Sequence, residues 1–221
     1  MEDKYRMTRE ENIFTAKRNI VDYIYKSARL EGFNITFPNT DAIINGGVVS
    51  GLTADEIVTV HNLKHAWHFV LDNIDHETNF ALVCEINRKV GANLIYNAGF
   101  VRNIPVRVGD FNPPLPVEAD IKDELKAASG LETATERSIT LMLTLMRRQV
   151  FMDGNKRTAM LAANHQMIKN GAGVISIPVE RIEGFSERLM DYYMTNDMTE
   201  IKRFVYDECI DGLAFESGIL T

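Results

Sequence analysis

The residues Gln149–Thr158 combine side chains that bind phosphate with one that binds a divalent cation. The stretch reads Gln-Val-Phe-Met-Asp-Gly-Asn-Lys-Arg-Thr. Gly154 allows a ligand to approach the backbone closely, and the Asn-Lys-Arg that follows it supplies hydrogen-bond donors and positive charge for phosphate oxygens. Asp153 offers a hard oxygen ligand of the kind that Mg²⁺ takes together with substrate phosphates. These residue types therefore predict a seat for a phosphorylated ligand and its metal.

This stretch joins two expected helices. Apolar residues at three- and four-residue steps predict one helix over 133–148 and another from about Gly154 to Asn170, which Gly171 ends. Free N–H groups and the macrodipole at the start of the second helix favour an anion. The alternative is that Asp153 is only an N-cap and that the two cations are solvated residues of the first turn, because Asp-Gly-Asn is also common turn chemistry. The pattern alone supports both interpretations about equally.

The remaining chain is expected to be mainly helical, with one β-hairpin. Residues 93–110 alternate apolar and polar types and contain turn formers, which predicts the hairpin, with Pro105 keeping one strand at an edge. Prolines at 113, 114 and 116 predict a stiff connector. No repeat, low-complexity tract or long linker divides the 221 residues, so we expect a single domain. Further helices are expected over 8–32, 53–74, 78–90, 117–128, 179–194 and 197–211.

Composition and charge argue against several classes of protein. The chain carries 24 Lys and Arg against 31 Asp and Glu, a net charge of −7, which argues against nonspecific nucleic-acid binding. A hydrophobic content of 45% and a charged content of 25% are typical of a globular protein and argue against disorder. No apolar run approaches the roughly 18 residues of a membrane span, and the charged N-terminus does not resemble a signal peptide. With only two cysteines, a reducing, cytoplasmic location is expected.

Phe151–Arg157 resembles the core motif of the Fic/Doc (Fido) family, which is His-x-Phe-x-Asp/Glu-Gly-Asn-x-Arg. Ser27–Gly32, with the sequence Ser-Ala-Arg-Leu-Glu-Gly, resembles the family's inhibitory motif Ser/Thr-x-x-x-Glu-Gly/Asn on an N-terminal helix. The expected hairpin at 93–110 resembles the flap on which a target protein docks. These features follow the family's order and cover most of the chain. The resemblance implies a mainly α, Fic-type helical domain with a β-hairpin flap, in which 1–50 hold the inhibitory helix and connector and 53–221 the core.

The resemblance implies ATP and Mg²⁺ as ligands, and transfer of AMP to a hydroxyl side chain of a target protein that lies along the flap as an added strand. In such a site Asp153 holds Mg²⁺, Arg157 contacts the phosphates, and Phe151 anchors the loop in the core. Glu31 points at the triphosphate end and opposes productive binding by its charge and bulk. Family members often regulate themselves by self-association, so a homo-oligomer is a further implied partner. The implied phosphate cradle is Gly154, Asn155 and Lys156, and the implied inhibitory residues are Ser27, Glu31 and Gly32.

Two positions depart from the family's pattern. Gln149 stands where the family has its catalytic His, four residues before the acidic position. That His is the general base, whereas an amide can hydrogen-bond a hydroxyl but cannot take its proton, so a loss of about 10²–10⁴ in rate is expected. Met160 stands where many members have a second Arg that pairs with the inhibitory Glu. Because members with Asn-Lys-Arg-Thr often lack this Arg, the second departure mainly leaves Glu31 without its usual partner.

Three functional hypotheses follow from these residues. The leading one is a degenerate family member that binds ATP and Mg²⁺ at Phe151–Arg157 but transfers AMP weakly or not at all. The alternative is an active protein adenylyltransferase or phosphotransferase that works without the motif His. The third is a noncatalytic interaction protein that has also lost nucleotide binding. His165 is not expected to replace the base, because it lies 12 residues beyond Asp153, about 18 Å along a continuous helix.

Three histidines, His61, His65 and His68, share one face of the helix expected over 53–74, at a spacing that would suit a metal site. No Glu follows His61 as it would in a zinc-protease helix, and no fourth ligand is evident. We therefore interpret them as ordinary histidines of a helix surface or of an interface.

Overall fold

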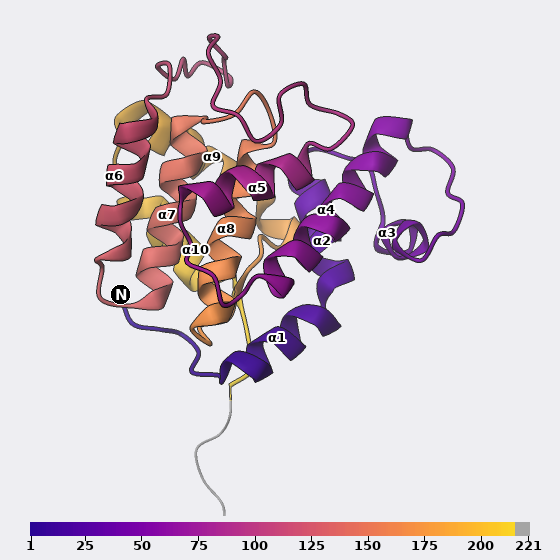
Figure 1. The fold of residues 1–221 in the computed structure, drawn as a ribbon. Coiled ribbons are helices and arrows are strands. Elements are labelled where there is room, and N and C mark those ends of the chain that lie inside the picture. The colour runs from indigo at the N-terminus through magenta and orange to yellow at the C-terminus, as the bar shows by residue number, and fades with distance from the viewer. Residues whose placement is uncertain (215–221) are drawn as a thin grey trace, which may run out of the picture.

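The computed structural model describes residues 1–214, and these form a mainly helical domain with one small antiparallel sheet (Figure 1). The predicted fold class is confirmed in this respect. No helix within 1–214 is both long and apolar enough to cross a membrane. The elements are α1 (Arg9–Arg18), α2 (Ile20–Leu30), α3 (Phe37–Ile44), α4 (Ala54–Asp72), α5 (Phe80–Val90), α6 (Glu118–Ser129), α7 (Ala134–Arg148), α8 (Asn155–Lys169), β1 (Val174–Ile175), the 3₁₀ turn η1 (Val179–Arg181), α9 (Ile182–Thr195), α10 (Thr199–Glu208) and β2 (Ile210–Asp211).

Helix α8 forms the centre of the domain, where it packs against α7, α5, α4 and α1 (Figure 1). It is buried on nearly every side, and its alanines at 159, 162 and 163 let neighbouring helices approach closely. A helix that is buried all round belongs to the core rather than to the surface. The joint between α7 and α8, which carries the motif, is therefore held by the best-packed part of the molecule.

The N-terminal helix predicted over 8–32 is two helices. Thr8 and Glu11 form a capping box that starts α1, as local sequence signals predict. The helical path then breaks at Asn19, which has φ −103° and ψ 11° and serves both as the C-cap of α1 and as the N-cap of α2. Helix α3 was not predicted, although Thr36 caps it and Pro38 lies in its first turn.

The small antiparallel sheet does not lie where the sequence predicted a hairpin. Its two strands are β1 and β2, with Val174 opposite Asp211. Residues 93–110 instead form turns followed by an irregular loop, and the nearest strand-like feature is one isolated bridge between Val108 and Phe111. Left-handed residues, including Asn97 (φ 58°), recur too closely here for two strands to grow.

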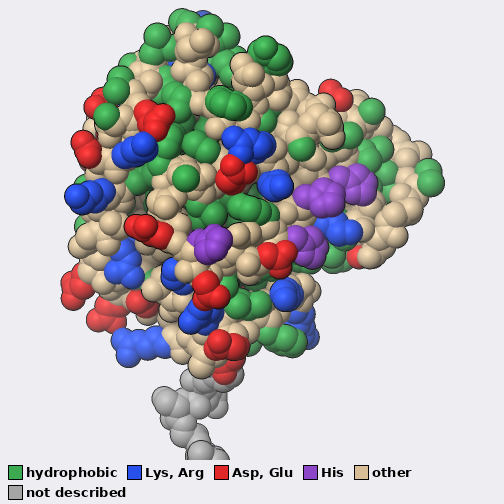
Figure 2. Space-filling model, in the orientation of Figure 1, with side chains coloured by type: hydrophobic (Ala, Val, Ile, Leu, Met, Phe, Trp, Pro, Cys, Tyr) green, Lys and Arg blue, Asp and Glu red, His purple; other side chains and the backbone are tan. Residues whose placement is uncertain are grey.

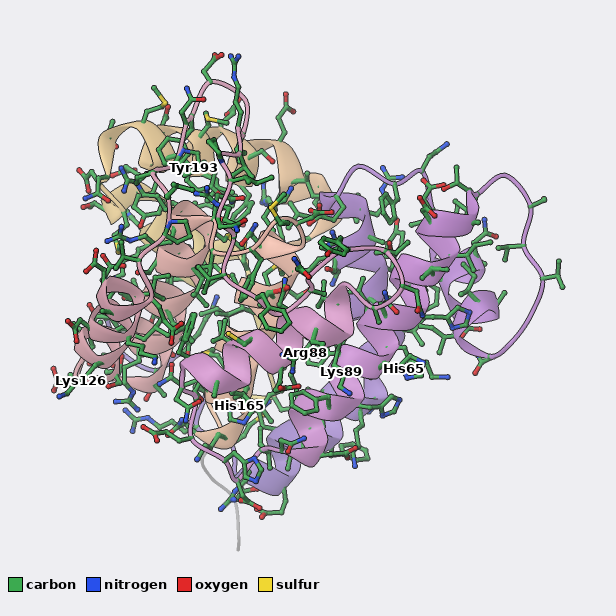
Figure 3. The ribbon with its side chains drawn as sticks, turned by 45° about the horizontal axis from the view of Figure 1, so that its top comes forward. His65, Arg88, Lys89, Lys126, His165 and Tyr193 are labelled. Atoms are coloured by element: carbon green, nitrogen blue, oxygen red, sulfur yellow. The ribbon has the colours of Figure 1, made fainter. Side chains whose placement is uncertain are left out.

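The histidines of α4 lie at the surface, as predicted. Figure 2 shows histidine side chains gathered on the exposed face over this helix, and Figure 3 places His65 there. His65 and His68 are exposed and His61 is partly exposed. Within residues 1–214 no group of three or more His, Cys, Asp or Glu side chains is arranged to hold a metal ion.

His165 is fully buried on α8, where its ring contacts the segment that connects α4 to α5 (Figure 3). Its Nε2 lies 2.9 Å from the carbonyl oxygen of Asn73, and its Nδ1 lies 2.8 Å from the hydroxyl oxygen of Thr78. The two contacts suit a neutral ring that donates to the carbonyl and accepts from the hydroxyl. Burial lowers the pKa of His165 from its usual 6.5, and the positive charge of Lys169 adds to this effect.

This lowered pKa predicts a loss of stability in acid. Below about pH 6.5 the unfolded chain takes up a proton that folded His165 does not, so the free energy of unfolding should fall as the pH falls, by at most about 1.4 kcal/mol per unit. His165→Gln keeps a donor and an acceptor and should lose this part of the pH dependence in urea unfolding between pH 5 and about 8. His65→Gln, at an exposed position of α4, is the control for the exchange of a histidine for glutamine. An unaltered slope in His165→Gln would contradict the assignment.

Candidate functional site

Two left-handed residues shape the joint between α7 and α8. Gln149, with φ 45°, ends α7, and Gly154, with φ 74°, starts α8. Glycine is needed at 154 for a second reason, because a Cβ there would lie 2.9 Å from Val90 Cγ1 and 3.4 Å from Asn87 Nδ2. One side of the Gly154 backbone is therefore packed against α5. The start of α8 faces away from α5, toward the cavity described below.

Asn155 braces the loop from within. Its Oδ1 accepts a hydrogen bond of 2.9 Å from the N–H of Phe151, and its Nδ2 donates to the carbonyl of Phe151 (2.8 Å) and to Oε1 of Gln149 (3.1 Å). The Asn155 side chain is buried, so it serves the loop rather than a ligand. The side chain of Asn155 is therefore not available to bind phosphate. Its predicted part in the phosphate cradle can fall only to its main-chain N–H, and this stays a prediction. Phe151 is 2% exposed, as a core anchor requires, and does not line the cavity described below.

A cavity of about 320 Å³ opens beside the joint. One end is polar and is formed by the motif loop and by Glu31 at the end of α2. The opposite wall is largely apolar and comes from α9 and from the loop before Phe111. The lining residues are Leu30, Glu31, Val106, Arg107, Val108, Gln149, Met152, Asp153, Gly154, Asn155, Lys156, Phe185, Ser186, Leu189, Met190 and Tyr193.

The first turn of α8 leaves main-chain donors free at this cavity. Gly154 has no side chain that could cap the helix. Among residues 1–214, the N–H groups of Asn155, Lys156 and Arg157 have no hydrogen-bond acceptor. Unsatisfied N–H groups and the positive end of the helix dipole form a ready site for an anion. The geometry thus fits the predicted phosphate seat, since no packed side chain caps these amides.

Asp153 is the carboxylate best placed to hold a cation at this seat. Its side chain is 68% exposed, its Oδ1 accepts a 2.6 Å hydrogen bond from the N–H of Gly154, and its Oδ2 lies 3.5 Å from Arg157 Nη2. Mg²⁺ binds well through one or two carboxylates together with phosphate oxygens and water. Asp153 suits such a shared arrangement.

The predicted inhibitory residue Glu31 has partners that the sequence did not suggest. Its two carboxylate oxygens lie 3.7 Å from Lys156 Nζ and 3.7 Å from Arg157 Nε. Lys156 Nζ also lies 3.4 Å from the carbonyl oxygen of Leu30. The end of α2 is therefore attached to the phosphate seat even though Met160 occupies the position of the second Arg.

Three other predicted site residues do not line the cavity. The Arg157 side chain is 8% exposed and does not line the cavity. It contacts the carboxylates of Glu31 and Asp153 instead. Ser27 is buried on α2, beside a small cavity that residues of α4 and α8 also line. Gly32 follows α2 with φ 87°, and a Cβ there would meet no atom within 4 Å. The left-handed backbone, and not a lack of space, is therefore the reason for a glycine at this position.

Gln149 is held by the loop and provides no base. Its Nε2 donates a 2.6 Å hydrogen bond to the carbonyl of Met146, while its Oε1 accepts from Asn155. Within 1–214 no histidine lines the cavity. His165 lies in the core instead, with Asn73 and Thr78.

Asn87, which sequence analysis missed, joins three parts of the site. Its Nδ2 donates to the carbonyl of Asp153 (3.1 Å) and to Oγ1 of Thr158 (3.0 Å), and its Oδ1 accepts a 2.7 Å bond from the N–H of Gly99. The sequence held one sign of this role, because the amide side chain of Asn87 lies on the apolar face of the helix expected over 78–90. Buried polar side chains are usually hydrogen-bonded to something specific.

Arg102 belongs to the hairpin expected over 93–110, but its buried position beside the α7–α8 joint was not predicted. It is 3% exposed, and burial lowers its pKa. Its guanidinium donates to the carbonyls of Gln149 (2.6 Å), Ile104 (2.8 Å), Pro113 (3.3 Å) and Pro114 (2.6 Å). One arginine thus fixes the end of α7, the loop and the proline connector together.

Comparisons with known sequences identify relatives of this chain. Residues 77–167, from before α5 into α8, match the model of the Fic/DOC family. The protein adenylyltransferase fic-1 of Caenorhabditis briggsae is 31% identical over 170 residues, and that of Caenorhabditis elegans is 30% identical. Each alignment covers 72% of this chain but 34% of the relative, so the chain spans about a third of the curated relatives it matches.

Solved structures show the same fold. Fic-1 (residues 134–508) from C. elegans has a TM-score of 0.71 at 24% identity, covering 86% of this chain and 60% of that one. A Fic domain-containing signalling protein from Bacteroides thetaiotaomicron has a TM-score of 0.68 at 18% identity, covering 90% of this chain and 85% of that one. Together with the motif and the arrangement of the α7–α8 joint, these matches show that the chain belongs to the Fic/DOC family.

Proposed function

We propose that this protein binds ATP with Mg²⁺ in the cavity at the α7–α8 joint, and that it transfers AMP to a protein hydroxyl weakly or not at all. The observation that carries the proposal is the pairing of free main-chain donors at the start of α8 with a Gln149 amide that is already hydrogen-bonded within the loop. The donors support binding, and the amide accounts for weak chemistry.

The two ends of the cavity suit the two ends of a nucleotide. Free amides and Lys156 at the polar end match a phosphate chain, with Asp153 beside it for the metal. The apolar side chains of Val106, Val108 and Leu189 on the opposite wall suit a base. Binding pockets for small molecules combine apolar walls with a few well-placed polar groups in this way. When bound, Mg²⁺ would supply positive charge to the phosphates.

Transfer needs a group that takes the proton of the incoming hydroxyl. The amide of Gln149 cannot do so at neutral pH, because it has no accessible protonation equilibrium there. Loss of a general base typically costs about 10²–10⁴ in rate. The relatives that this chain matches are named protein adenylyltransferases, so the proposed difference lies in the efficiency of the chemical step.

The target would dock on the loop before Phe111 rather than on a hairpin. Residues 100–107 belong to no helix or strand and have no partner strand within 1–214, and Val106 already lines the cavity. An extended peptide can add to such a segment through main-chain hydrogen bonds. Arg102 would hold the segment in place for this encounter.

Nucleotide binding should be measurable and should depend on the metal through Asp153. Calorimetric titration with ATP should give heat that decreases strongly when Mg²⁺ is removed. Asp153→Asn should abolish this dependence on Mg²⁺, because the amide removes the charge on which the cation relies. Asp207→Asn is the matched control, since Asp207 also pairs with an arginine four residues away, Arg203, but lies outside the cavity. No heat at millimolar ATP would refute the proposed function.

Removal of the charge at Glu31 should tighten ATP binding. The carboxylate occupies Lys156 and Arg157 and repels phosphate, so Glu31→Gln should lower the Kd several-fold, up to about tenfold. Glu208→Gln serves as the control, because Glu208 pairs with Arg181 at 3.1 Å outside the cavity. Equal Kd values for wild type and Glu31→Gln would show that Glu31 does not compete with the nucleotide.

Restoring the motif base should raise AMP transfer. Gln149→His is expected to increase incorporation of label from ATP into protein by roughly 10²–10⁴, and Glu31→Gly in the same chain should increase it further. Gln149→Asn changes the side chain without adding a base and should give no gain. Strong labelling by the wild-type chain that vanishes in Asp153→Ala would instead show that transfer proceeds without the His.

A further inference from the structure

Tyr193 on α9 has a buried hydroxyl group with no hydrogen-bond partner among residues 1–214. The residue is 2% exposed, and it lines the same cavity as Gly154 and Lys156. Most buried polar groups have a partner, because leaving one unpaired costs free energy. A hydroxyl that stays unpaired at the wall of a binding cavity indicates a partner that arrives with the ligand.

The ring of Tyr193 is fixed, so the hydroxyl cannot turn away from the cavity at little cost. Its centroid lies 5.2 Å from that of Phe111, and its carbonyl accepts a 3.2 Å hydrogen bond from Arg147 Nε. Figure 3 shows Tyr193 on α9 close to the loop that precedes α6. Burial raises the pKa of Tyr193, and the Gln149 amide close to the hydroxyl lowers it in part, but that amide donates its hydrogen bond to the carbonyl of Met146 (2.6 Å) and makes none to Tyr193. The phenol therefore stays protonated and can donate.

The position of Tyr193 along the cavity defines the part of the ligand that it can reach. It follows Leu189 of the apolar wall by one helical turn. It also neighbours Gln149, whose side chain is hydrogen-bonded to Asn155 at the start of α8. The hydroxyl thus lies between the wall that suits a base and the amides that suit the phosphate chain.

We propose that the Tyr193 hydroxyl donates a hydrogen bond to the nucleoside monophosphate half of the bound nucleotide, at the sugar or at the first phosphate. This inference rests on the proposed nucleotide binding and adds a specificity-determining residue to it. It also explains why the chain keeps an unpaired buried hydroxyl, since the ligand satisfies it. Because AMP, ADP and ATP share this half, the contribution of Tyr193 should be the same for all three.

The test compares Tyr193→Phe with Tyr192→Phe. Phenylalanine at 193 keeps the packing on Phe111 and removes only the hydroxyl. Tyr192 is the matched control, because it is the adjacent buried tyrosine on the same helix but lines a different cavity, between α6, α7 and α9. Calorimetry with AMP, ADP and ATP in the presence of Mg²⁺ should show Kd raised by about 3- to 10-fold in Tyr193→Phe, by a similar factor for each nucleotide, and unchanged in Tyr192→Phe.

Stability of the ligand-free protein separates this role from a structural one. Since the hydroxyl of Tyr193 has no partner without ligand, Tyr193→Phe should leave the Tm unchanged or raise it, while the rise in Tm on adding ATP becomes smaller. Wild-type binding with an unchanged Kd in Tyr193→Phe, or a loss seen with ATP but not with ADP, would overturn this inference and leave the proposed function standing. Absence of nucleotide binding by the wild type would overturn both.

Discussion

Hydrogen bonds from buried side chains to the main chain of the α7–α8 loop are the constraint on which the site depends. The loop has no secondary structure of its own, so its inward-facing groups need partners from elsewhere. Asn155 satisfies Phe151, Asn87 satisfies the carbonyl of Asp153, and Arg102 satisfies the carbonyl of Gln149. These side chains bond to the groups on the inner side of the loop and make no hydrogen bond to the first N–H groups of α8, so those N–H groups stay free within the described residues.

The charges at the seat balance in the ligand-free protein. Two carboxylates, Glu31 and Asp153, face two cations, Lys156 and Arg157, within 3.5 to 3.7 Å. Under the proposed function, a phosphate chain at this seat would displace Glu31 from the cations, and Mg²⁺ would compensate the charge that the chain adds beside Asp153. The proposed nucleotide would therefore compete with the end of α2 for the same two residues, which would give regulation a physical basis even with Met160 in place of an arginine.

Sequence patterns identified the helices around the site because their signals are local. Apolar periodicity and flanking turn residues mark the helices predicted over 133–148 and 154–170. No end of these two predicted helices differs from the corresponding end of α7 or α8 by more than one residue. The hydrogen bonds that hold the loop were missed because they join distant residues: Asn87 bonds to a residue 66 positions away, and Arg102 to one 47 positions away. The hairpin was misplaced for the same reason, because the N–H of Arg102 pairs with Val150 and not with a neighbouring strand.

Binding and chemistry rest on different atoms of this site, which is why one can persist without the other. The phosphate seat is built from main-chain N–H groups and from the left-handed Gly154, and none of these involves the side chain at 149. The Gln149 amide fills its place between Met146 and Asn155 with one donor and one acceptor, so the loop keeps its shape. A glutamine at 149 that makes these contacts but cannot accept a proton would weaken the chemical step and leave the seat intact, which is the separation that the proposed function requires.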